Sequence, residues 1–334
     1  MPSEKQYQER RENIISILQY IRTHGPASRR QISADLSLSW GCVSELVSIL
    51  LLQKILLEDE GQNTGAKGRT PTLLRLNTAL HFLGVDINRN GLNACVCDLS
   101  GEKVAAYKDT LRYSSKEELL HSVCSFVERI ADQSIAGICF AMQGIPDEGK
   151  QVWAFPAEPP IPIDFSKELQ SRLDIPFTVE HDPNCILYGC LDATKKNIMI
   201  VRLDRGIGAA IYTQNGFLEN DLLELGHLVV TEDGQRLQEL VSLNALEQAE
   251  DRDAYFAAAG KHLGVTLGNL CNLICLDKIY LCGDLTRYYP RFRDTMEQHY
   301  TTTVLPGHSA KLSVVDVTDA GYGAAKMAMD KFQY

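Results

Sequence analysis

Near the N-terminus, apolar residues recur at helical spacing in two neighbouring stretches. The first predicted helix, residues 29–36, follows Ser28, and the second, residues 40–50, follows Ser39. A serine directly before a helical pattern is a typical N-cap, because its hydroxyl accepts a hydrogen bond from the first turn. The inner faces of the two helices carry the apolar residues Ile32, Leu36, Val43, Leu46, Val47 and Leu50. The pattern predicts a helix-turn-helix.

A strand-like pattern follows the second helix. Residues 55–58 and 72–76 are mostly apolar, and the polar loop between them ends in Lys67-Gly68-Arg69-Thr70-Pro71. Two short strands joined by such a loop form a hairpin, which after these helices is a wing. Its tip is narrow and cationic, a shape that a DNA minor groove accepts. We therefore expect residues 1–78 to form a winged helix-turn-helix domain.

The outer face of the second helix is built for close approach to DNA. Apart from Trp40 its residues are small, so they can lie against base edges in a major groove. The residues predicted to contact DNA are Arg29, Arg30, Ser39, Trp40, Gly41, Ser44, Ser48, Lys67 and Arg69. The alternative is a small helical domain that binds protein, with the basic loop as a solvated surface.

The distribution of charge favours DNA. Residues 1–80 carry 10 Lys and Arg against 8 Asp and Glu, net +2, whereas the rest carries 23 against 35, net −12. A basic end on an acidic chain is what phosphate contact at that end requires. The second helix argues the other way, since it has no Lys or Arg and contains Glu45. We therefore expect sequence preference to depend partly on the wing.

Beyond residue 78 the pattern changes to alternating strands and helices. Asp86 ends an apolar strand that turns into a second one, and Asp204 does the same in the second half of the chain. Two such units predict a duplicated α/β domain with a cleft between the copies. We expect the copies to span residues 79–190 and 191–316, with a final helix, 317–334, packing back on the first. The strands are predicted at residues 82–87, 92–97, 103–107, 135–142, 198–203 and 209–213, with a helix at 115–131.

The composition of the chain indicates where in the cell the protein is expected to act. The chain has 334 residues, 45% hydrophobic and 23% charged, with a polar N-terminus and no apolar run near the roughly 18 residues of a membrane helix. None of the ten cysteines forms a CxxC pair, and most lie in apolar runs. Reduced thiols are therefore expected, and with them a cytoplasmic protein without a membrane partner.

Five short motifs in the body resemble those of the ROK family, which groups sugar-responsive repressors with bacterial sugar kinases. In order they are Gly144-Ile145-Pro146-Asp147, His181-Asp182-Pro183-Asn184, Gly206-Ile207-Gly208, Glu224-Leu225-Gly226-His227 and Asp319-Ala320-Gly321-Tyr322-Gly323-Ala324-Ala325. The resemblance implies an actin-like, ribonuclease-H-like duplicated sugar-kinase fold after the winged helix. It also implies an effector cleft formed by Gly144, His181, Asp182, Glu224 and His227.

Departures from the family's motifs argue against an enzyme. By resemblance, Asp182 stands at the position of the kinases' catalytic base. The glycines and threonine expected after Asp86 are replaced by Asn88-Arg89-Asn90, Arg205 replaces a threonine in the second phosphate turn, and Asp284 adds a negative charge near the adenosine side. We therefore expect no catalytic residue, no kinase activity and no cofactor.

The zinc and sugar motifs are also incomplete. Residues 231–239 contain no cysteine where the family's zinc cluster stands, so no metal is expected and His227 is not predicted to be a ligand. On the sugar side, His181, Cys190 and Ala157 replace an Asn, a Glu and an Asn, which predicts altered sugar recognition. Two structural alternatives stay open: Asp182 could simply cap the following helix, and His227 could be a structural histidine.

The resemblance thus implies a cytoplasmic transcriptional regulator, expected to be a repressor. Its partners would be operator DNA, a sugar or sugar-derivative effector, and a second copy in a homodimer or larger homo-oligomer. One alternative is a sugar kinase with a fused regulatory domain, and another is a dimeric regulator that works without a ligand.

Overall fold

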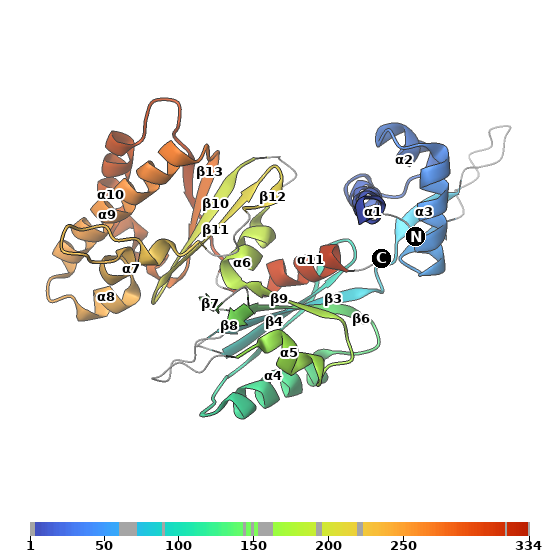
Figure 1. The fold of residues 1–334 in the computed structure, drawn as a ribbon, viewed down its shortest axis with the longest axis horizontal. Coiled ribbons are helices and arrows are strands. Elements are labelled where there is room, and N and C mark those ends of the chain that lie inside the picture. Colours follow the sequence, from blue (N-terminus) through green and yellow to red (C-terminus); the bar gives the residue numbers. More distant parts are fainter. Residues whose placement is uncertain are drawn as a thin grey trace.

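The computed structural model describes residues 4–59, 72–88, 91–142, 145–147, 150–152, 163–191, 196–218, 223–317 and 319–332. A small N-terminal domain lies beside two α/β lobes, and the end of the last helix, residues 321–331, contacts that domain (Figure 1). Within these residues no helix has both the length and the apolar content needed to cross a membrane.

The N-terminal domain contains the predicted helix-turn-helix and the paired strands of the wing. Ser28 and Ser39 cap the two helices as predicted, and Ser28 forms a full capping box with Gln31. The two strands that follow pair antiparallel, with Leu56 opposite Leu76. The elements are α2 (Arg29–Asp35), α3 (Trp40–Leu52), β1 (Leu56–Asp59) and β2 (Leu73–Leu76).

A long first helix, α1 (Glu4–His24), was not predicted. Its inner face is formed by Ile14, Ile17, Leu18 and Ile21, all buried in the core shared with α2 and α3. This spacing of apolar residues is the signal that could have identified the helix. The polar residues before it conceal the pattern, because they make the first turns of α1 look like a solvated terminus.

The first lobe is a five-stranded sheet with the order β5-β4-β3-β6-β9. Strands β3, β4 and β5 are antiparallel, whereas β6 and β9 run parallel to β3. Asp86 lies inside β3, opposite Asn93 of the neighbouring strand, so β3 is longer than predicted. The strands are β3 (His81–Asn88), β4 (Gly91–Asp98), β5 (Lys103–Asp109), β6 (Ile135–Met142) and β9 (Phe177–His181), beside the small pair β7 (Ile145–Asp147) and β8 (Lys150–Val152).

The second lobe repeats this topology. Its order is β12-β11-β10-β13-β14, again with antiparallel strands on one side of the first strand and parallel strands on the other. The predicted duplication is therefore confirmed, since both sheets use one strand order and one set of directions. The strands are β10 (Ile198–Leu203), β11 (Ile207–Thr213), β12 (Gly216–Phe217), β13 (Lys278–Cys282) and β14 (Lys311–Val314).

Helices cover the faces of both sheets and connect the lobes. In the first lobe α4 (Lys116–Ile130) and α5 (Phe165–Gln170) bury one face. The other face is covered by α6 (Asp182–Cys190) and α11 (Gly321–Lys331), and α6 also contacts β10 and β11 (Figure 1). The second lobe carries η1 (Leu225–His227), α7 (Leu237–Leu240), α8 (Leu243–Gln248), α9 (Arg252–Leu273), η2 (Asp284–Tyr288) and α10 (Tyr289–Thr303). Helix α6 thus lies at the seam between the lobes.

Candidate functional site

The candidate DNA-reading surface is the outer face of α3. Val43, Leu46, Val47 and Leu50 are buried against the rest of the domain, which directs the other face to solvent. Trp40 is 58% exposed, and a Cβ built on Gly41 would meet nothing within 4 Å. The helix therefore presents an open, largely uncharged surface with room for a close partner.

Several predicted DNA contacts have neighbours inside the domain. Ser39 accepts a hydrogen bond from the Cys42 amide at 3.2 Å, and the Ser48 hydroxyl donates to the Ser44 carbonyl at 2.7 Å. Arg29 pairs with Glu58 at 3.2 Å, whereas Arg30 is exposed. Ser39, Ser48 and Arg29 can therefore contact DNA only by giving up or sharing these contacts within the domain. Lys67 and Arg69, and Gly144 in the body, lie outside the described residues.

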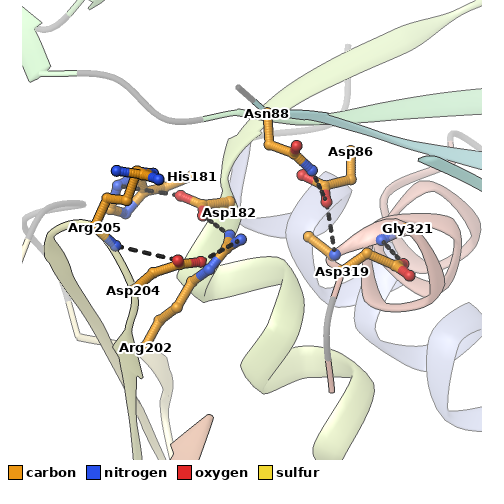
Figure 2. Close-up of polar contacts among 10 residues, drawn as sticks. Asp86, Asn88, His181, Asp182, Arg202, Asp204, Arg205, Asp319 and Gly321 are labelled. Atoms are coloured by element: carbon orange, nitrogen blue, oxygen red, sulfur yellow. Dashed lines mark hydrogen bonds and ion pairs between the residues drawn. The ribbon is translucent and has the colours of Figure 1, made fainter. Parts of the chain in front are cut away.

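The candidate effector cleft centres on Asp182, the first residue of α6. Its Oδ2 accepts a hydrogen bond from a guanidinium N–H of Arg202, which projects from β10 in the other lobe (Figure 2). Asp182 is 3% exposed and Arg202 7%, so the pair is shielded from water. Position 181, not 182, is the N-cap of α6, and it makes no side-chain cap bond. The interpretation of Asp182 as a helix cap is therefore wrong: its carboxylate joins the two lobes.

Arg202 is surrounded by carboxylates from both lobes. It also pairs with Asp204 at 3.5 Å, and Asp86 acts on it electrostatically. Burial alone would lower the pKa of Arg202, but the three carboxylates more than offset burial and raise it. A charged guanidinium can stay in this site because the surrounding carboxylates compensate its desolvation.

Asp86 is the least accessible of these carboxylates. Its Oδ2 accepts hydrogen bonds from Asn88 at 2.9 Å and from the Ala320 amide at 3.3 Å (Figure 2). Its Oδ1 has no hydrogen-bond partner, and neither does the buried Nδ1 of His181. Burial raises the pKa of Asp86 to about 6, although Arg202 acts to lower it. Asp86 and His181 therefore offer buried polar atoms that a ligand hydroxyl could satisfy.

The second phosphate turn is occupied by internal ion pairs. Asp204 follows β10, and the Arg205 side chain turns away to Glu247 and Asn244, at 3.0–3.2 Å. Burial raises the pKa of Asp204, and the nearby Asp284 raises it further. Gly208 brings β11 against the first turn of α6, where a Cβ would come within 2.9 Å of Pro183 Cγ. This turn is thus closely packed, and its carboxylates are paired with arginines.

Glu224 and His227 form a separate, more accessible pair. Their side chains are 39% and 37% exposed and lie 3.6 Å apart, from Oε2 to Nε2. Arg236 donates to Nδ1 of His227 at 3.1 Å, so this nitrogen acts as the acceptor. Within the described part of the chain, neither side chain bonds directly to Asp182, and no group of three or more His, Cys, Asp and Glu residues is arranged to hold a metal ion. Among the described residues, Glu224 and His227 therefore form one contact pair, and His181 and Asp182 form another.

Arg202 is the important residue that sequence reasoning missed. It stands inside the apolar run of residues 198–203, from which the sequence predicts only a strand. A signal was present, because a charged residue in a strand buried on both faces needs a partner. The sequence cannot identify that partner, since Asp182 is 20 residues away in another lobe.

Comparisons with known proteins place this geometry in context. The sequence profile of the ROK family matches residues 82–238. The xylose repressor of Bacillus subtilis is 22% identical over 364 residues, covering 95% of this chain and 94% of the repressor.

Solved structures give the same picture of the fold. A ROK family transcriptional regulator, a homologue of the Escherichia coli Mlc protein, superposes with a TM-score of 0.79 at 18% identity, over 96% of this chain and 97% of that one. A ROK family glucokinase from Streptomyces griseus, in complex with glucose and AMPPNP, has a TM-score of 0.61 at 17% identity, over 74% of this chain and 99% of its own. The predicted fold, a duplicated sugar-kinase body after an N-terminal winged helix, is confirmed.

Proposed function

The chain belongs to the ROK family through residues 82–238, and we propose that it is an operator-binding transcriptional repressor that a sugar or sugar derivative releases from DNA. The observation that carries the proposal is the winged helix domain with the largely uncharged, exposed outer face of α3 on a sugar-kinase-like body. A relative matched along nearly its whole length is a xylose repressor, which supports the same assignment. We infer that the protein acts in the cytoplasm as a homodimer or larger homo-oligomer, because helix-turn-helix proteins commonly read two half-sites.

The cleft supports ligand sensing without phosphoryl transfer. A general base needs a carboxylate within reach of the substrate hydroxyl, and Arg202 occupies one oxygen of Asp182. Asp204 in the second phosphate turn is paired with Arg202, and Asp284 on the expected adenosine side is paired with Arg287, so both carboxylates stand where the motifs of a kinase would admit the nucleotide. These contacts favour a binding site over a kinase site. In the binding role, Asp86 Oδ1 and His181 Nδ1 would hydrogen-bond to sugar hydroxyls.

A regulator that works without a ligand is the second candidate. The observation that favours it is the Arg202–Asp182 pair, which already satisfies the residue expected to accept a sugar hydroxyl. In that case the pair would act only as a structural connection between the lobes, and DNA binding would respond to oligomerisation.

One experiment tests the main proposal. The full chain is used to select duplexes from a random DNA library, and binding of an enriched duplex is measured by anisotropy with and without xylose, glucose, N-acetylglucosamine or mannose. Enrichment of one motif, with release by one sugar, is the expected result. Trp40→Ala, on the outer face of α3, should weaken binding of the enriched duplex. Leu273→Ala, at an exposed residue of the body, is the matched control and should leave binding unchanged. Failure to enrich any duplex would reject the DNA-binding function, and enrichment without release would favour the ligand-independent candidate.

A further inference from the structure

Tyr188 lies near the end of α6 opposite to Asp182. Its ring contacts Tyr212 and Phe217 of the second lobe, with ring centres 6.3 and 6.1 Å away. Its hydroxyl donates a hydrogen bond to Oδ2 of Asp330 at 2.6 Å. Burial raises the pKa of Tyr188, and the neighbouring Asp330 carboxylate raises it further. One side chain on the cleft helix therefore contacts the second lobe and the C-terminal helix together.

Asp330 continues the connection into the N-terminal domain. Its other carboxylate oxygen pairs with Nη1 of Arg22, on α1, at 3.3 Å, and Arg22 also donates to the Leu99 carbonyl at 3.2 Å. The Arg22 and Asp330 side chains are 19% and 16% exposed. An ion pair this far from solvent is screened less than a surface pair. Arg22 thus fastens the winged helix domain to the helix that carries Asp330.

The backbones of α6 and α11 are in direct contact, so these helices cannot slide independently. A Cβ at Gly323 would lie 1.6 Å from the Cys185 carbonyl oxygen. The backbone of α11 also lies against β3, where a Cβ at Gly84 would lie 2.0 Å from the Gly321 carbonyl oxygen. Such contacts transmit a displacement instead of absorbing it. A change in the tilt of α6 must therefore reach α11.

We propose that Tyr188 and Asp330 are positioning residues that relay the orientation of the cleft helix α6 to the winged helix domain through Arg22. The second lobe holds α6 at both ends, through Arg202 on Asp182 and through the Tyr212–Phe217 rings on Tyr188. A movement of the second lobe therefore acts on the Tyr188 side chain through the Tyr212 and Phe217 rings, and from its hydroxyl on Asp330 and the Arg22 pair. As a mechanism of effector release this relay rests on the proposed function, but the relay itself can be measured without DNA or effector.

The test measures hydrogen–deuterium exchange of α1 in the free, full-length chain, in a double-mutant cycle. Asp182→Asn weakens the pair at the cleft end, and Tyr188→Phe removes the hydroxyl but keeps the ring. Asp182→Asn alone should speed exchange of α1 by about threefold or more, and should have little effect on α1 when combined with Tyr188→Phe. Asp330→Asn should interrupt the response in the same way.

Tyr212→Phe is the matched control, because among the described residues the Tyr212 hydroxyl has no hydrogen bond, although the ring lies in the same cluster. When Asp182→Asn is combined with Tyr212→Phe, it should still speed the hydrogen–deuterium exchange of α1. Equal effects of Asp182→Asn with and without the Tyr188 hydroxyl would overturn the relay, as would unchanged α1 exchange in Asp182→Asn alone. If no duplex is enriched but the coupling is present, the relay stands and the operator-binding proposal fails.

Discussion

Arg202 on β10 donates a hydrogen bond to Asp182 at the start of α6, and this buried pair joins the two lobes of the protein. It occupies the carboxylate that, by resemblance to the ROK kinases, is predicted to stand at their catalytic position. The same contact therefore bears on stability, on the proposed lack of kinase activity and on the proposed response to a ligand.

Arg202→Met should destabilise the protein by about 3–5 kcal/mol, because it leaves a buried carboxylate without its partner. The measurement is urea-induced unfolding at pH 7. Adding Asp182→Asn should recover about half of the loss or more, since the uncompensated charge is then removed as well. Strictly additive losses in the double variant would mean that the two side chains do not stabilise each other.

Asp86 should make the protein less stable as the pH rises from about 4 to 6. Its pKa is raised from 3.8 to about 6 in the folded state, so the folded protein binds the proton more tightly than the unfolded chain does. The stabilisation is fully present below pH 4 and is lost as the pH rises through 6. A difference of about two pKa units corresponds to about 3 kcal/mol. The unfolding free energy of the native protein relative to Asp86→Asn should fall by about that amount from pH 4 to 7, and a constant or rising difference would contradict the prediction.

Ser44→Ala should relax base preference at one operator position, because Ser44 lies on the outer part of α3 that is proposed to face the major groove. The discrimination lost at that position should be at most about 1–3 kcal/mol, the usual cost of one mismatched base pair. Binding of single-base variants of the selected duplex measures it. Ser48→Ala is the comparison, since the Ser48 hydroxyl donates to the backbone of its own helix. An unchanged preference in Ser44→Ala would remove this residue from the reading surface.

Arg69→Ala should weaken DNA binding across all sequences and lower the slope of log Kd against log salt by about one, because it removes one cation near the phosphates. This prediction rests on the sequence alone. Titrations of the selected duplex at several salt concentrations test it, with Lys103→Ala, on β5 of the body, as a charge-matched control. Unchanged binding would exclude the wing tip from the interface.

A sugar should stabilise the protein, whereas ATP should neither stabilise it nor be hydrolysed. A ligand at about 100 times its Kd contributes about 2.7 kcal/mol. Thermal unfolding with xylose, glucose, N-acetylglucosamine, mannose, their phosphates and ATP measures this effect, and Asp182→Asn should lose it. Elemental analysis should find zinc below one equivalent. Sugar-dependent ATP hydrolysis that disappears in Asp182→Asn would instead favour the kinase.

Asp182→Ala should lower stability as well as the ligand response. If Asp182 only bound an effector, this change would leave folding largely intact. The Arg202 contact alters that expectation, because alanine leaves a buried guanidinium with Asp204 as its remaining ion-pair partner among the described residues. The shape-conserving Asp182→Asn therefore separates the two effects better.

The sequence by itself determined the local structure and the plan of the fold. Ser28 and Ser39 mark the starts of their helices because capping involves residues three positions apart or fewer. The strands and the duplication follow from periodicity and turn chemistry, which are also local. The family motifs extended this to a body like that of the sugar kinases. Helix α1 was missed although its signal was local, because a polar first half concealed it.

Only the tertiary structure decided which charged groups meet. Arg202 reaches Asp182 across 20 residues, and Asp330 reaches Arg22 across 308, so neither pairing has a sequence spacing that predicts it. Both depend on strand register and on the close packing of α6 against α11, which fix side chains to within an ångström or so. Burial then decides their role, since a carboxylate that water would solvate becomes one side of an ion pair where water is excluded. The sequence could therefore name Asp182 as a candidate, whereas its ion-pair partner was decided by the lobe that packs against it.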